Sequence, residues 1–335
     1  MTTLPTRAAI IDPATTNAEQ KTNIGDQRDF IAEMLGTDSS NKAAARELLG
    51  LGQPLIQDFR LSLTTAVPVT TADVTGATTL YATPFAGKNI ALYDGTNWNV
   101  RQSAEFSVAL GALTASIGYD VFCYDNAGVP TLELLAWTSA TVRATALVRQ
   151  DGVLVKSGAP TRRYMGSFYT TSTTTTADAA VSTSGRYLFN YANRKVRNLL
   201  LQVATANWTY TTATWRQANN SASNQVNWFV GVIEDAVEIH GVHVAVPTNA
   251  VGTAAAIGLN STTTPSGLYG SGKSNSSSSI PGYVHTPKLK ALPQLGLNKA
   301  CLLEWSEAID TTSWYGVVSS SSQQIQSGLI GEVMA

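Results

Sequence analysis

The chain has 335 residues, of which only 13% are charged, and its net charge is −1 with an isoelectric point near 6.3. Such a chain offers no basic surface for phosphate contacts, which argues against nucleic-acid binding. It contains no apolar run of about 18 residues that could span a membrane. Because no basic start and apolar segment of a secretory signal is visible either, we expect a protein made in a cytoplasm, without membrane insertion.

The low charge also bears on assembly. The charged fraction is about half that of an average globular protein. A monomer normally exposes more charge than this, so we expect much of the surface to be buried between subunits. The alternative is a monomer whose surface is simply rich in Ser and Thr.

The first segment of the chain differs from the rest. Residues 1–50 carry 12 of the 45 charged side chains and show helical periodicity, with Thr16 and Glu19 at capping-box spacing and Gly36 able to end the helix. An apolar stripe lies between these signals and consists of Ile24, Phe30, Ile31, Met34 and Leu35. The stripe is too narrow to form a core alone. We therefore predict that residues 1–55 are a helical arm that attaches the chain to another surface.

From Leu61 onward the apolar residues alternate with a period of two, which predicts β-strands. Asp94-Gly95, between IALY and NWNV, is a strong hairpin signal, and Asn126-Ala127-Gly128 and Asp151-Gly152 mark further turns. Other strands are expected at 106–115, 119–125, 131–137 and 141–149. This spacing predicts an antiparallel sandwich or barrel module over residues 56–170.

A polar segment follows at residues 171–185. Its Ser/Thr-rich composition predicts an exposed connector, although a threonine-rich segment can also form a strand. Residues 186–335 then predict a jelly-roll-like β module in which 260–298 is mostly loop. Its expected strands are 186–192, 196–204, 207–215, 226–232, 237–246, 253–259, 299–306, 312–318 and 325–334. The predicted fold is thus mainly β, with a short helical arm before two antiparallel sandwich or jelly-roll-like modules.

One segment matches a nucleotide-binding pattern literally. Residues 267–274 (GLYGSGKS) fit the P-loop sequence G-x-x-x-x-G-K-S. A working P-loop needs a buried strand before it and a helix after it, so that backbone amides and the helix N-terminus hold the phosphates. The flanking NSTTTPS and NSSSSIPG satisfy neither condition. We therefore interpret the segment as a solvated loop and assign Lys273 no phosphate-binding role.

The histidines give no metal-binding pattern. His240 and His243 are three residues apart on an expected strand, so their side chains should point to opposite faces. His285 is alone in a Pro-rich segment. Cys123 and Cys301 each lie in an apolar run, and we expect two buried free thiols rather than a disulfide. No metal or other cofactor is predicted.

Two groups of acidic residues are candidates for a hydrolytic pair. Glu234, Asp235 and Glu238 lie close together near a turn, and Glu304 and Glu307 flank Trp305. Paired carboxylates can hydrolyse glycosidic bonds, but acidic residues at strand ends are usually just solvated. We predict no catalytic residues and no enzyme activity.

The aromatic residues carry a second hypothesis. The chain has seven tryptophans, Trp98, Trp137, Trp208, Trp215, Trp228, Trp305 and Trp314. A tryptophan can stack on a sugar ring, but for any single one of them we favour the other role, which is to fill the core of a sandwich. Trp208 and Trp215 have the polar or aromatic neighbours Tyr210, Arg216, Asn219 and Asn220, which suits a sugar platform.

Several strings resemble a known family. The arm QKTNIGDQRDFIAEMLGTDSSNKAAARELLGL is similar to N-terminal segments of tailed-bacteriophage fibre proteins, although Ser39-Ser40 stand where glycine is common. LYDGTNW, GYDVFCYDNAG, TALVRQDGVLVKSG and TRRYMGSF look like a β module of phage fibres and other virion-surface proteins, and RYLFNYANRKVRNLL through TATWRQAN looks like its companion. The resemblance covers most of residues 15–235. The remaining part is only generically similar to trimeric jelly-roll heads.

The resemblance implies a virion structural protein located at the virion surface and assembled in the host bacterial cytoplasm. It implies a trimeric protein fixed to other tail or capsid proteins by its N-terminal arm, and of the virion parts compatible with it we expect a homotrimeric tail fibre. A head fibre or a capsid decoration protein without receptor binding is the alternative, and a polysaccharide-degrading tailspike is a further one.

The composition of two loops suggests where such a protein would bind its host. Residues 216–225 and 260–285 combine Asn, Ser, Gly and Tyr, as recognition surfaces do. We therefore predict that a host-surface glycan or protein, if one is bound, contacts Tyr269 and Tyr283.

Overall fold

The computed structural model describes residues 55–181, 184–273, 282–320 and 324–335. These residues form antiparallel sheets, so the prediction of a mainly β fold is confirmed. Their only helical element is the short 3₁₀ turn η1 (Ala218–Asn220). No helix in this part of the chain is long and apolar enough to cross a membrane. The predicted helical arm and its stripe lie outside the described residues.

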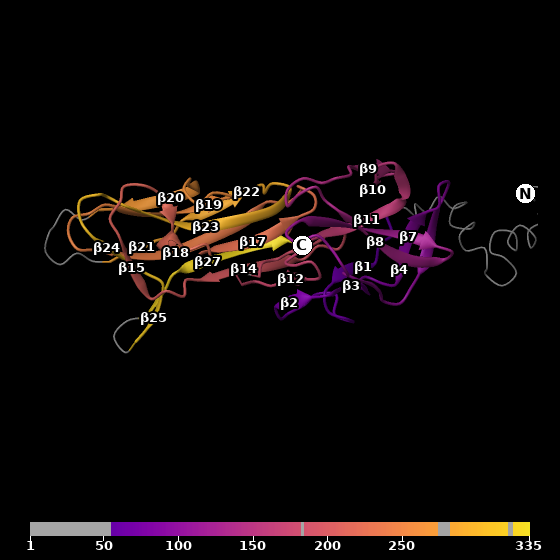
Figure 1. Ribbon diagram of the computed structural model, residues 1–335, viewed down its shortest axis with the longest axis horizontal. Helices are drawn as coiled ribbons and strands as arrows, with labels where there is room; N and C mark the ends of the chain where they lie inside the picture. Colours follow the sequence, from indigo (N-terminus) through magenta and orange to yellow (C-terminus); the bar gives the residue numbers. More distant parts are fainter. Residues whose placement is uncertain (1–54, 182–183, 274–281, 321–323) are drawn as a thin grey trace, which may run out of the picture.

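The body is elongated, with two groups of sheets along its long axis (Figure 1). The first group contains a three-stranded sheet, β1 (Phe59–Ser62), β3 (Thr79–Pro84) and β6 (Phe106–Ala109), and the hairpin of β4 (Asn89–Tyr93) and β5 (Trp98–Gln102). Its larger sheet has the order β8 (Val129–Ala136), β7 (Gly118–Asn126), β11 (Ala159–Tyr169), β10 (Val153–Lys156) and β9 (Leu147–Gln150). The strands β2 (Val74–Ala77) and β12 (Thr176–Asp178) pair beside these sheets.

The second group is built on one large sheet, which curves so that its two halves face each other. One half contains β14 (Val196–Gln202), β27 (Gly328–Met334), β18 (Val237–Pro247), β22 (Lys288–Ala291), β21 (Tyr283–His285), β24 (Thr312–Tyr315) and β15 (Asn207–Tyr210). The other half contains β20 (Ser266–Gly272), β19 (Thr253–Leu259), β23 (Gly296–Ser306), β17 (Gln225–Val230) and β16 (Arg216–Gln217). A separate hairpin of β25 (Val317–Ser319) and β26 (Gln324–Gln326) projects from the body (Figure 1).

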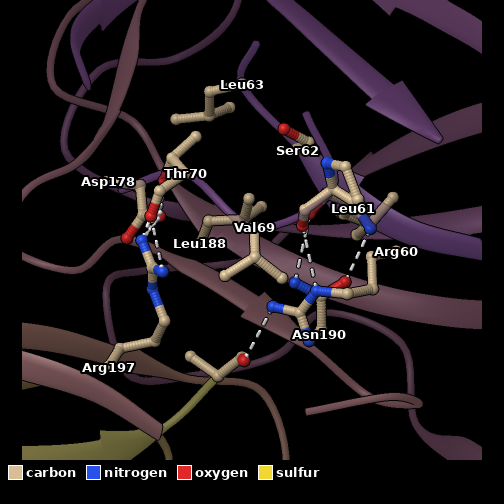
Figure 2. A pocket seen from close by; sticks show the side chains of 12 residues that line it. Arg60, Leu61, Ser62, Leu63, Val69, Thr70, Asp178, Leu188, Asn190 and Arg197 are labelled. Atoms are coloured by element: carbon tan, nitrogen blue, oxygen red, sulfur yellow. Dashed lines mark hydrogen bonds and ion pairs between the residues drawn. The ribbon is translucent and has the colours of Figure 1, made fainter. Parts of the chain in front are cut away.

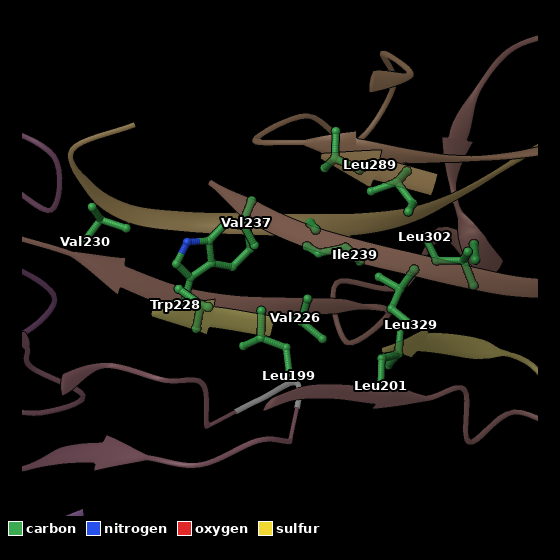
Figure 3. Packing of buried hydrophobic residues seen from close by; sticks show 14 of the residues in the cluster. Leu199, Leu201, Val226, Trp228, Val230, Val237, Ile239, Leu289, Leu302 and Leu329 are labelled. Carbon is green, nitrogen blue, oxygen red and sulfur yellow. The ribbon is translucent and has the colours of Figure 1, made fainter. Parts of the chain in front are cut away.

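Strict alternation of side chains produces the core of the second group. Along β14, β18 and β27 every second residue is buried, as expected for strands with one face inward. The inward residues meet those of β17 and β23, and Figure 3 shows Trp228 packed among Leu199, Val226 and Val237. Trp228 is fully buried. Of the two roles weighed for a tryptophan, Trp228 therefore has the structural one.

The predicted turns are confirmed where the structure describes them. Residues 94–97, which begin with Asp94-Gly95, join β4 to β5, Ala127 and Gly128 join β7 to β8, and the Asp151-Gly152 turn joins β9 to β10. Asp151 and Gly152 both have positive φ, 50° and 87°. An Asp-Gly pair tolerates this conformation, which a two-residue hairpin requires.

Several predicted strands are shorter than expected. The strand predicted at 106–115 ends at Ala109, because the chain turns at Gly111, whose φ is 51°. The strand predicted at 207–215 ends at Tyr210, whose hydroxyl donates to the Thr214 carbonyl 2.7 Å away and holds a returning loop. The strand predicted at 141–149 begins only at Leu147. Conversely, 260–298 is less loop-rich than predicted, since it contains β20, β21, β22 and the start of β23.

The Ser/Thr-rich segment is not an exposed connector throughout. Residues 176–180 are buried, and β12 pairs with β2, which agrees with the alternative of a threonine-rich strand. The strand that follows, β13 (Leu188–Asn190), pairs with β11 of the first group. β13 contributes Leu188 to the core of the first group and Phe189 to the core of the second, so the two groups of sheets are not separated by a free linker.

A buried polar cluster lies at this junction (Figure 2). Asp178 is 7% exposed and accepts hydrogen bonds from Arg197 Nη2 at 2.9 Å and Thr70 Oγ1 at 3.2 Å. Arg186 Nη1 lies 3.2 Å from the other Asp178 oxygen. Arg60 donates to the carbonyl groups of Pro68, Asn193 and Ala335, which connects β1 with the end of β27. Charged side chains thus fix the relative position of the two groups.

Candidate functional site

The distal end of the second group is the part of the body farthest from β1–β11, and it carries β15, β21 and β24 (Figure 1). Tyr283, on β21, lies at this end, and Tyr269 lies on the neighbouring strand β20. Both strands lie within the segment predicted to be mostly loop. The region is built from residues that are far apart in the sequence.

Tyr269 belongs to an exposed aromatic pair. Half of its surface is accessible, and its ring meets Trp215 edge to face, with centroids 5.1 Å apart and an interplanar angle of 78°. Trp215 is half-buried and packs on Ala256, Cys301 and Leu303 of the outer side of β19 and β23. An aromatic face held rigidly by a sheet and open on one side is suited to contact a ligand.

Tyr283 belongs to a different aromatic pair. It is half-buried, and its ring centroid lies 6.2 Å from that of His285. Gly272 of β20 lies directly under the ring, since a Cβ at this position would come within 2.7 Å of it. The structure thus places the two predicted tyrosines on adjacent strands but gives them separate partners.

The other predicted recognition loop, 216–225, is largely not a free loop. It contains β16 and η1, and Gln217, Ala218 and Asn224 are buried. Asn224 Nδ2 donates to the Ala218 carbonyl at 2.8 Å, which closes the turn on itself. Exposed polar groups in this stretch are therefore limited to its tip around residues 220–223.

Trp208 and Trp215 do not form one platform. Trp208 turns inward, and its Nε1 donates to Glu304 Oε2 at 2.8 Å. Arg216 Nε donates to Glu304 Oε1 at 2.7 Å, and the guanidinium lies 3.7 Å from the Tyr210 ring centroid. Glu304 is fully buried, and this burial raises the pKa of its carboxyl to about 7 although Arg216 acts in the opposite direction. The sequence indicated which polar and aromatic residues lie near Trp208, but not that the Trp208 side chain points inward.

The remaining acidic candidates are held in separate ion pairs. Glu307 accepts two hydrogen bonds from Lys273 Nζ, at 2.9 and 2.7 Å. Glu234 and Asp235 both pair with Arg194, and Glu238 pairs with His240 and Lys290. Glu304 and Glu307 thus have different partners and different exposure. In the described part of the chain, no three His, Cys, Asp or Glu side chains are placed to hold a metal ion.

A pair of buried histidines was missed by sequence reasoning. His240 and His243 do point to opposite faces of β18 as predicted, and His243 is fully buried. His285, however, is not in a loop: it lies on β21 directly opposite His243. The His243 ring lies 4.5 Å from Trp314 and 5.6 Å from Trp208, and neither of its nitrogens has a hydrogen-bond partner. Burial lowers the pKa of His243 to about 3 and that of His285 to about 4.

Both cysteines are buried free thiols, as predicted. Cys123 lies in the core of the first group, and burial raises its pKa to about 12. Burial raises the pKa of Cys301 to about 11. A thiol held protonated in this way is a poor nucleophile.

The P-loop-like segment has another structure. Residues 266–272 form β20, an exposed strand, where a solvated loop had been expected. Gly267 has a φ of 72°, and a Cβ there would come within 2.4 Å of the Lys288 carbonyl, so this glycine serves strand packing. Lys273 pairs with Glu307. The residues that would begin a helix after Lys273 lie outside the described part of the chain.

Replacing Lys273 with alanine is expected to leave folding and stability nearly unchanged. The side chain is half-exposed and makes a surface ion pair, which contributes about 0–1 kcal/mol. Isothermal calorimetry with ATP should detect no binding to either protein. Measurable affinity that the Lys273→Ala variant lacks would contradict this reading of the segment.

No family model and no curated protein matches this chain. The solved structures similar to it include the infectious bursal disease virus VP2 subviral particle, at 13% identity and a TM-score of 0.28, covering 86% of this chain and 77% of that chain. They also include two Bacillus thuringiensis proteins. The insecticidal delta-endotoxin Cry8Ea1 has 6% identity and a TM-score of 0.22 and is matched over 83% of this chain and 51% of that chain. The Cry1Da tryptic core variant has 12% identity and a TM-score of 0.17, and the match covers 83% of this chain and 54% of that chain.

The chain thus spans about half the length of the two endotoxin structures. All three TM-scores are too low to assign a shared fold or a shared function.

Proposed function

We propose that the chain is a non-enzymatic structural protein of a bacteriophage virion surface, a trimeric tail fibre attached by its N-terminal arm. The resemblance of residues 15–235 to fibre and virion-surface segments is the starting point. In this proposal the two groups of sheets are sandwich-like modules, the second resembling a jelly roll. The second group of sheets presents its distal end to the host cell.

The observation that carries the proposal is the exposed Trp215–Tyr269 pair on an elongated β body. Tyr269 is half-exposed on a strand whose neighbour β19 is buried, so it is rigidly supported and accessible at once. Rigid aromatic side chains contribute contact area at a low entropic cost. In a trimer the pair would occur three times, which would turn a weak contact with a host glycan or protein into strong avidity. Tyr283 would extend this surface.

Purified full-length protein should compete with the parent phage for adsorption to host cells. The full chain is required because β13 and the Asp178 cluster join the two groups of sheets. Tyr269→Ala should weaken competition, and Tyr283→Ala should weaken it less because that ring is half-buried. Val129→Ala, at an exposed position of the first group, is the matched control. Absence of competition by folded wild-type protein would instead favour a head fibre or a capsid decoration protein.

Deleting residues 1–50 is expected to leave a folded β body that no longer joins virions. The described strands begin only at Phe59, so the deletion removes none of them. Circular dichroism of the truncated protein and its amount on purified particles are the two measurements. Normal incorporation of the truncated protein would show that the arm is not the anchor.

A further inference from the structure

We propose that the outward face of β14, β27, β18, β22 and β21 is the surface through which copies of this chain contact one another. The inference rests on the proposed trimer and assigns its interface. This face is the side of the sheet turned away from the Trp228 core shown in Figure 3. It is made of the alternate residues that the core does not use.

The face carries large apolar side chains that are accessible to solvent in the single chain. Val242 is 40% exposed, Ile330 61%, Val284 63% and Val196 57%. Leu268, 77% exposed, lies on the adjoining strand β20. Single exposed apolar residues are common, but a contiguous set usually marks an interaction surface.

Strand register shows that these residues are contiguous. Ile330 lies opposite both Leu200 of β14 and His240 of β18. His240 lies opposite Lys288 of β22, which lies opposite Leu268. This row crosses the face from β14 to β22 and continues onto the adjoining strand β20. Beside it, Val242 follows His240 on the same side of β18.

A second apolar row lies farther along β18. Val244 lies opposite Val284 of β21 and, on its other side, opposite Tyr315 of β24. Val242 and Val244 are successive outward residues of the same strand, so the two rows adjoin. The apolar surface thus extends over several strands, as an interface between subunits requires.

The charges of the face indicate a second copy as the occupant. Glu332 lies directly opposite Glu238, an unfavourable pair of like charges. Lys290 pairs with Glu238 at 3.3 Å, whereas Glu332 and the exposed Lys288 have no ion-pair partner among the described residues. The face therefore offers one unpaired acid and one unpaired base. Around a symmetry axis a neighbouring copy brings the complementary group to each.

The test is the oligomeric state of the full-length chain. Sedimentation equilibrium should show a trimer for the wild type. Val242→Glu and Ile330→Glu place a carboxylate in the interface and should raise the concentration of half-assembly by roughly tenfold or more. Val129→Glu and Val148→Glu, at exposed strand positions of the first group, should change nothing. Near-ultraviolet circular dichroism checks that each variant is folded.

A charge exchange gives a second, independent measurement. Glu332→Lys and Lys288→Glu should each weaken assembly, and the double variant should recover part of it. A wild-type trimer that Ile330→Glu and Val242→Glu leave intact would overturn this interface while leaving the proposed fibre standing. A wild-type monomer at micromolar concentration would overturn both the trimer and the interface.

Discussion

Replacing Asp178 with alanine is expected to lower the free energy of unfolding by about 3–5 kcal/mol. Asp178 is buried and is bonded to Arg197 and Thr70, as Figure 2 shows, and also to Arg186. Without its carboxylate, two buried guanidinium groups lose their nearest counter-charge, and the remaining acid, Asp73, is 3.9 Å from Arg186. The cost is that of a buried charge left without a partner. Urea unfolding followed by tryptophan fluorescence measures it.

Lys273→Ala is the matched control for this measurement. It also breaks an ion pair, but a solvent-exposed one, so its cost should stay within about 1 kcal/mol. The Asp178 variant should in addition uncouple the two groups of sheets, because the cluster joins β12, β14 and the segment around Thr70. A single cooperative transition at the wild-type midpoint would contradict this role of the cluster.

Local signals in the sequence predicted much of the fold. The alternation of β14, β18 and β27 and the Asp-Gly turns depend on neighbouring residues only. These elements therefore lie close to where they were expected. Strand ends were less well predicted, because they depend on distant contacts. Leu110 N, for example, donates to the Thr78 carbonyl just where β6 ends.

The interior of the distal end could not be predicted in this way. His243 and His285 are 42 positions apart and meet only through the pairing of β18 with β21. Arg216 reaches Glu304 through the pairing of β16 with β23. Pairings of this kind are set by the whole fold, and a sequence read in local windows does not contain them. For the same reason the sequence does not show that Trp208 points inward to Glu304 while Trp215, close to it in sequence, packs on the outer side of β19 and β23.

The histidines at this end give the protein an acid-sensitive core. His243 lies beside Trp314 and Trp208 with no partner for a proton, and His285 lies opposite it. Both pKa values are lowered, so the unfolded chain takes up protons at these histidines at a higher pH than the folded chain does. The folded state therefore keeps its full stability above the ordinary pKa of 6.5 and loses stability as the pH falls below it.

Glu304 changes the stability in the opposite direction. Its pKa is raised to about 7, so its protonation stabilises the folded state between pH 7 and its ordinary value of 4.5.

His243→Phe should therefore reduce the loss of stability on acidification by about 2 kcal/mol between pH 7 and pH 5. At pH 5 the unfolded wild-type chain binds a proton at residue 243, whereas the folded chain, with a pKa of about 3 there, does not. The variant loses this difference and keeps Glu304, His285 and Arg216, so subtracting the two pH profiles isolates residue 243. Urea unfolding at a series of pH values supplies both profiles. His240→Gln, on the solvent side of the same strand, should retain the wild-type loss. Parallel profiles for the wild type and His243→Phe would show that His243 takes up its proton without unfolding the distal end.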